Sequence, residues 1–99
     1  MINLKSDDIL KYCANHSIAE SKLMSSIREY TNNNEKIPQM VCGPQVAGVL
    51  KMLINLTGSE RILEIGTFTG YSSAAMAEEI SNIGEIHTCE LMEKHAQTA

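Results

Sequence analysis

The sequence predicts an α/β fold in which parallel β-strands are joined by an α-helix. The apolar run 61–65 has the length of a buried parallel strand. A turn containing Gly66 and Gly70 follows it, and a segment rich in Ser and Ala begins at Tyr71. A second short strand is expected at 85–90. This order favours a right-handed βαβ unit.

Composition and charge narrow the class of protein. The 99 residues form at most one domain, with 43% hydrophobic and 20% charged residues, which is typical of a globular chain. The chain has 8 basic and 12 acidic residues, a net charge of −4 and no basic cluster, so a nucleic-acid partner is not expected. No apolar run approaches the roughly 20 residues of a membrane span, and residues 1–8 are not a signal peptide, so no membrane is expected either.

Cysteine usage indicates the compartment. Cys13, Cys42 and Cys89 are odd in number and far apart in the sequence. They are expected to be reduced thiols of a cytoplasmic protein, not a disulfide framework or a zinc site.

Two short amphipathic helices are predicted before the strand. Ser6 can cap a helix that begins near residue 7. Ser17 and Glu20 match the capping-box pattern, so the second helix is predicted to start there and to run to about Tyr30. Residues 31–34 are predicted to be a loop. These helices either cover the core or form a lid or dimer surface.

A third helix is predicted to lead into the first strand. The residue before Pro38 avoids the α region, so the chain is extended there. Pro44 suits the first turn of a helix, and apolar residues at helical spacing continue to Gly58, where the helix should stop. After the glycine turn, a helix is predicted from Tyr71 to about Ile80, and another helical segment begins at residue 91.

The glycine turn limits the class of ligand that can bind. In the dinucleotide fingerprint G-x-G-x-x-G, the second glycine lets the backbone approach a pyrophosphate, but Phe68 occupies that place here. The sequence contains no P-loop pattern either. A nucleoside with a small linker that carries no phosphate fits better, and S-adenosylmethionine has such a linker.

Acidic residues at the two strand ends agree with this interpretation. Glu90 ends the second strand, where a carboxylate can accept both ribose hydroxyls. Glu64, near the end of the first strand, could accept hydrogen bonds from the ligand's ammonium group, directly or through water. Each could alone be a surface acid, but together with Gly66 and Gly70 they predict a nucleoside site.

Three strings carry a resemblance to a known family: Met40-Val41-Cys42, the stretch 63–72 (L-E-I-G-T-F-T-G-Y-S) and Cys89-Glu90. They resemble the class I S-adenosylmethionine-dependent O-methyltransferases of the caffeoyl-CoA/catechol type. The pattern E-I-G-x-x-x-G-Y-S is specific to that branch. The resemblance implies that residues 36–99 are the first half of a Rossmann-like cofactor-binding domain, and that residues 1–35 are an N-terminal helical extension.

The resemblance also implies a set of residues that bind S-adenosylmethionine. They are Val41, Cys42, Glu64, Gly66, Thr67, Gly70, Ser72 and Glu90. Glu64, Gly66 and Thr67 would stand at the methionine end, Ser72 would bind the carboxylate, and Glu90 would hold the ribose. Related sequences often have a hydroxyl residue at position 42, so a buried structural thiol stays an alternative for Cys42. Phe68 and Tyr71 are expected to be packing residues.

Catalytic groups and metal ligands are not expected within this sequence. The family implies a divalent metal held by two Asp and an Asn, a Lys base, and a phenolic or diol acceptor, and those residues come later in the family. The acidic pairs at 7–8 and 78–79 are not expected to bind metal. We therefore expect an N-terminal part of an O-methyltransferase that is inactive by itself.

Two other functions stay open. A non-catalytic binding module could pair with itself or with another chain, and a homodimer or partner is expected to cover the incomplete sheet in either case. An oxidoreductase fragment of the NAD type is disfavoured by Phe68.

Overall fold

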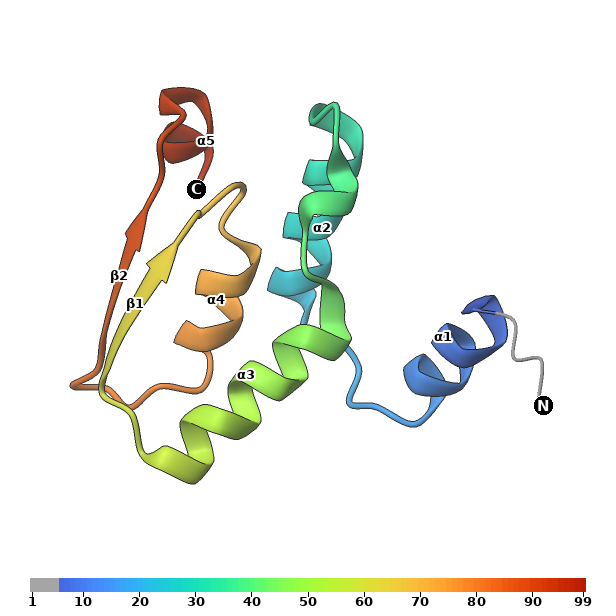
Figure 1. Ribbon diagram of the computed structural model, residues 1–99, viewed down its shortest axis with the longest axis horizontal. Helices are drawn as coiled ribbons and strands as arrows, with labels where there is room; N and C mark the ends of the chain where they lie inside the picture. The colour runs from blue at the N-terminus through green and yellow to red at the C-terminus, as the bar shows by residue number, and fades with distance from the viewer. Residues whose placement is uncertain (1–5) are drawn as a thin grey trace.

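The computed structural model describes residues 6–99 and confirms the α/β class (Figure 1). The expectation about a signal peptide falls largely on residues 1–5, which lie outside the described residues. The elements in chain order are α1 (Ser6–Asn15), α2 (Lys22–Asn34), the 3-10 helix η1 (Pro38–Met40), α3 (Gly43–Thr57), β1 (Arg61–Ile65), α4 (Tyr71–Ala77), β2 (Glu85–Cys89) and α5 (Glu93–Thr98).

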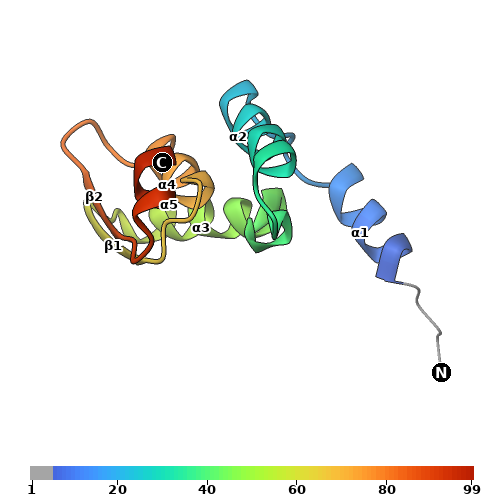
Figure 2. The same ribbon diagram turned by 90° about the horizontal axis from the view of Figure 1, so that it is seen from above.

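The two strands are parallel neighbours, as the βαβ pattern predicts. Arg61 pairs with Glu85 at one end, and Ile65 pairs with Cys89 at the other. The crossover helix α4 packs against β2, and α2 and α3 pack against α4, so these helices lie on one side of the sheet (Figures 1 and 2). Leu63 and Ile65 point to the opposite face, where they are 68% and 78% exposed. None of the described elements covers that face.

The core lies between three helices. Met24 of α2, Ala47 of α3, and Tyr71 and Ala75 of α4 form one buried cluster. The two alanines are small, so the helices can approach closely, and the buried apolar surface supplies most of the stabilisation. Helix α1 contacts α3 and lies farthest from the sheet (Figures 1 and 2).

The capping-box prediction at Ser17 and Glu20 is wrong. Helix α2 begins at Lys22, and its cap is Ser21, whose Oγ accepts a hydrogen bond from the backbone N–H of Met24 at 3.2 Å. The Ser17 hydroxyl instead donates to a carbonyl oxygen at the end of α1. The Glu20 carboxylate is held by tertiary partners in place of the helix terminus.

The loop predicted at residues 31–34 is also wrong, because these residues form the last turn of α2. Thr31 is fully buried, and its hydroxyl lies 2.7 Å from that of Thr69 in the glycine turn. The tertiary contact outweighs the weak local preference of the asparagines that follow. The end of α2 is thereby attached to the turn.

Three predictions for the segments after α2 can be compared with the structure. The segment at Pro38 forms a short 3-10 helix, and Ile37 before it (φ −127°, ψ 66°) avoids the α region as expected but is not extended. Gly58 ends α3 in the left-handed region, with φ +62°, which confirms the predicted stop. Helix α4 ends at Ala77, earlier than the predicted Ile80.

The expectation that no apolar run approaches the length of a membrane span is wrong, because one segment of the described residues is long and apolar enough by length and composition. The segment Pro38–Thr57 has 20 residues, and an 18-residue window within it has a mean hydropathy of 1.3 and is 11% buried. Its regular helix, α3, has only 15 residues. At 1.5 Å per residue it is about 22 Å long, less than the roughly 30 Å of a hydrocarbon core. Ala47 and Ile54 are buried in the protein.

Ser21→Ala tests the observed cap. The variant loses the hydrogen bond to the Met24 N–H and the one from the Ser21 hydroxyl to Glu78, so the free energy of unfolding should fall by about 1 kcal/mol. Urea denaturation measures the change. Ser17→Ala is the matched control and should change it by less than about 0.5 kcal/mol. An equal decrease in the free energy of unfolding in both variants would contradict this assignment and favour the predicted capping box at Ser17.

Candidate functional site

The turn between β1 and α4 has a left-handed backbone at three positions. Gly66, Phe68 and Gly70 have φ values of +90°, +54° and +83°. Glycine adopts this region freely, whereas a side chain there costs about 1–3 kcal/mol. Apart from Gly66 itself and its two chain neighbours, no described residue has an atom within 4 Å of a Cβ built on Gly66, so the backbone is open to a ligand at that point. The conformation of Phe68 is not evident from the sequence pattern.

Contacts on both sides hold Phe68 in this conformation. Its N–H donates to the carboxylate of Glu90 at 2.8 Å. Its ring meets that of His95 edge to face, with centroids 4.8 Å apart. The side chain therefore packs between the turn and α5, in agreement with the packing role predicted for it.

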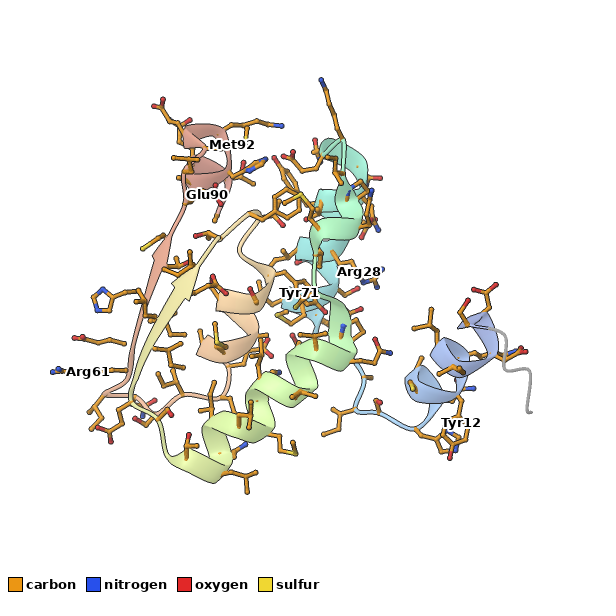
Figure 3. The ribbon with its side chains drawn as sticks, in the orientation of Figure 1. Tyr12, Arg28, Arg61, Tyr71, Glu90 and Met92 are labelled. Carbon is orange, nitrogen blue, oxygen red and sulfur yellow. The ribbon has the colours of Figure 1, made fainter. Side chains whose placement is uncertain are left out.

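Glu90 follows β2, and its carboxylate binds the backbone of the turn. It accepts hydrogen bonds from the N–H groups of Thr67 at 3.1 Å, Phe68 at 2.8 Å and Met92 at 2.9 Å. These N–H donors, with Met92 contributing most, hold the pKa of Glu90 below its usual value. Figure 3 shows Glu90 and Met92 where β2 leads into α5. The carboxylate is thus ionised and placed at a strand end, where Glu90 was predicted to bind a ligand.

Glu64 lies on the sheet face that α4 covers. Its carboxylate accepts hydrogen bonds from the hydroxyls of Ser72, Ser73 and Thr88. Ser73 and Thr88 were not predicted as site residues, because hydroxyl partners of a carboxylate follow no fixed spacing. An ionised carboxylate offers about four acceptor positions, so Glu64 keeps capacity for one further donor.

A small cavity of about 70 Å³ lies against the turn. The predicted residues that line it are Val41, Cys42, Gly66, Thr67 and Ser72. Gly70 and Glu90 line a neighbouring hollow beside α4, and Glu64 is connected to the small cavity through its hydrogen bond with Ser72. The structure therefore brings residues from three separate segments of the chain to one place.

Cys42 lies between the core and the small cavity. It is partly buried, packs against the core cluster beside Val41, and also lines the small cavity. Burial raises the pKa of its thiol, so the group is neutral at neutral pH.

A larger cavity of about 580 Å³ opens from Gly66 and Glu90. Its walls include Glu35 from the end of α2, Met40 of η1, and His95 of α5. Sequence reasoning missed Glu35 and His95, because they are far apart in the chain and match no motif.

Tyr71 of the glycine-turn motif is anchored to the leading helices. It is 2% exposed, and its hydroxyl donates to Glu20 at 2.7 Å. Burial, together with the Glu20 carboxylate, raises the pKa of Tyr71. Arg28 pairs with Glu20 at 2.7 Å, and its hydrogen bond lowers the pKa of that carboxyl. Tyr71 is therefore a packing residue, as predicted.

Comparisons with known proteins identify the family of the chain. The sequence profile of a family described as O-methyltransferase matches residues 14–99. The chain belongs to the O-methyltransferase family. The O-methyltransferase ankF of Aspergillus thermomutatus is 37% identical over 81 residues, which are 81% of this chain and 34% of that protein. Caffeoyl-CoA O-methyltransferase 1 of Zea mays is 37% identical over 87 residues, 84% of this chain and 33% of that protein.

A solved structure agrees with these relatives. The O-methyltransferase from Bacillus cereus in complex with SAH has a TM-score of 0.82 and 28% identity, covering 93% of this chain and 41% of that protein. The family assignment confirms the resemblance seen in the motif, and the fold corresponds to the N-terminal part of these Rossmann-like proteins. The chain spans about a third of the length of the curated relatives it matches.

Acidification should weaken the hydrogen bond from the Tyr71 hydroxyl to Glu20. The pKa of Glu20 is lowered in the folded protein. Its contribution to the free energy of unfolding is therefore complete above the ordinary glutamate pKa of about 4.3 and is lost as the pH falls through the lowered value. Urea denaturation at about pH 7 and about pH 3.5 should show this loss. Glu20→Gln should be less stable at neutral pH and lose less on acidification. Glu60→Gln, which changes an exposed carboxylate, is the control and should show the same pH dependence of stability as the native chain.

Proposed function

We propose that this chain carries the S-adenosylmethionine-binding part of an O-methyltransferase. The observation that carries the proposal is the open backbone at Gly66, which lines the small cavity together with Ser72 and the larger cavity together with Glu90. A ligand with a polar amino-acid end and a ribose fits this order of groups. Family membership supports the same ligand class.

The residues present fit the cofactor in their chemistry. The Ser72 hydroxyl would meet its carboxylate, and the remaining acceptor position of Glu64 would take its ammonium group, directly or through water. Glu90, which is ionised, would accept a ribose hydroxyl. When bound, the cofactor supplies an electrophilic methyl group on a sulfonium. This chain's own residues bind and orient it, which is how much of the catalytic effect of such enzymes arises.

The acceptor oxygen of the whole protein is proposed to belong to a small phenolic or diol compound. The described residues do not fit the divalent metal of the family, because residues 6–99 hold no group of three or more His, Cys, Asp or Glu side chains able to bind one. The role proposed for residues 6–99 is to bind and orient the cofactor. The cytoplasm is the proposed location.

Calorimetry with S-adenosylhomocysteine tests the cofactor proposal. The native chain should bind it, and Glu90→Gln should bind at least about tenfold more weakly, since a charged acceptor is lost. Glu85→Gln changes an exposed carboxylate at the opposite end of β2 and should bind like the native chain. Affinity for NAD without affinity for S-adenosylhomocysteine would contradict the proposal in favour of the oxidoreductase alternative.

The exposed sheet face is proposed to be covered by a second copy or another chain. Leu63 and Ile65 place apolar surface there, and burying it would be favourable. Sedimentation of the purified chain should show a dimer that Ile65→Lys converts to a monomer. Ile83→Lys, at an equally exposed position in the turn before β2, should leave the dimer intact. A native chain that sediments as a folded monomer would count against this partner.

A further inference from the structure

Glu64 is held by hydroxyl groups alone. Its carboxylate accepts hydrogen bonds from Ser72, Ser73 and Thr88. Within residues 6–99, no Lys, Arg or His side chain forms an ion pair with it. Neutral donors hold the carboxylate in place without compensating its charge. A cationic group that reached it would therefore gain a charge-assisted hydrogen bond.

The two carboxylate oxygens of Glu64 have different partners. Oε1 accepts from both Ser73 and Thr88, and the bond from Thr88 is 2.7 Å long. Oε2 accepts from Ser72 alone. Each carboxylate oxygen has about two acceptor positions. Oε1 is therefore fully occupied, and the remaining acceptor position of Glu64 lies on Oε2.

Thr88 reaches Glu64 from the neighbouring strand. The two residues are partners in the parallel register of β1 and β2, so their side chains lie on the same face of the sheet (Figure 1). The Thr88 hydroxyl has one hydrogen, which it gives to Glu64. The hydroxyl of Thr67 in the glycine turn must therefore donate to that of Thr88. Thr88 thus links the turn to the carboxylate.

Ser72 cannot donate to Glu64 and to the ligand at the same time. Under the proposed function, its hydroxyl donates to the carboxylate of the cofactor. A serine hydroxyl has one hydrogen, and in the structure Ser72 gives it to Glu64 Oε2. When this hydroxyl turns to the ligand, Oε2 loses its donor. The two hydrogen bonds to Oε1 then hold the Glu64 side chain in place.

We propose that Ser73 and Thr88 are positioning residues, which hold Glu64 by Oε1 and direct its Oε2 at the ammonium group of the cofactor. The inference rests on the proposed function. A glutamate side chain has many rotamers, so without these two bonds the ligand itself would have to order the carboxylate. Affinity for the amino-acid end of the ligand should therefore depend on both hydroxyls.

Two ligands separate this role from a purely structural one. S-adenosylhomocysteine carries the ammonium group, whereas 5′-methylthioadenosine has the same nucleoside and a thioether without the amino-acid end. In calorimetry, Ser73→Ala should bind S-adenosylhomocysteine about tenfold more weakly, and 5′-methylthioadenosine within about twofold of the native chain. Alanine is a better helix former than serine, so α4 should not be weakened. Ser26→Ala, which loses one hydroxyl hydrogen bond in α2, is the matched control and should bind both ligands as the native chain does.

Thr88 is tested by removing and restoring its hydroxyl. Thr88→Val keeps the shape of the side chain and should also bind S-adenosylhomocysteine about tenfold more weakly. Thr88→Ser should restore the affinity to within about twofold of the native value. In a Glu64→Gln background, neither Thr88→Val nor Ser73→Ala should cause a further loss, because both act through that carboxylate. Ser73 carries the deciding test, since Thr88→Val also leaves the hydroxyl of Thr67 without its acceptor.

The outcomes separate this inference from the proposed function. If the native chain binds no S-adenosylhomocysteine, the proposed function fails and the inference fails with it. If the native chain binds it and Ser73→Ala binds it equally well, only the inference is overturned. Equal losses of affinity for both ligands in Ser73→Ala, or a further loss in the Glu64→Gln background, would also overturn the inference alone. Circular dichroism checks that each variant is folded.

Discussion

The hydrogen bonds from the glycine turn to Glu90 are the interaction on which the site depends. The carboxylate at the end of β2 accepts the N–H groups of Thr67 and Phe68 and so holds Phe68 in a left-handed conformation. The turn also donates from Gly66 to the carbonyl oxygen of Cys89 at 2.8 Å. The end of one strand is therefore linked to the turn after the other. Without these links the open backbone at Gly66 would not have a defined position beside Glu90.

The leading helices contribute to the same region. The end of α2 meets the turn through the hydroxyl pair Thr31–Thr69, and its start is linked to α4 through Glu20, which accepts from Tyr71. Glu35 then pairs with α5 across the larger cavity. Because these contacts come from both ends of α2, the helix forms one wall of the site in addition to covering the core.

Residues that lie within one local pattern could be predicted from the sequence. The strand at 61–65, the stop at Gly58 and the glycine turn follow from short-range rules, and the structure agrees. The predicted cofactor residues Val41, Cys42, Gly66, Thr67 and Ser72 do meet at one cavity. The cap at Ser21 and the last turn of α2 could not be predicted, because tertiary partners of Glu20 and Thr31 compete with the local pattern.

The sequence by itself determined the family and predicted the ligand class, because the string from Glu64 to Ser72 encodes a strand end, a turn and a helix start in consecutive residues. Only the tertiary structure decided which groups surround that turn. Glu35, Lys94 and His95 come together through a contact between residues about sixty positions apart, and no local spacing records it. Likewise, three backbone N–H groups occupy Glu90, and this occupancy depends on the conformation of the turn.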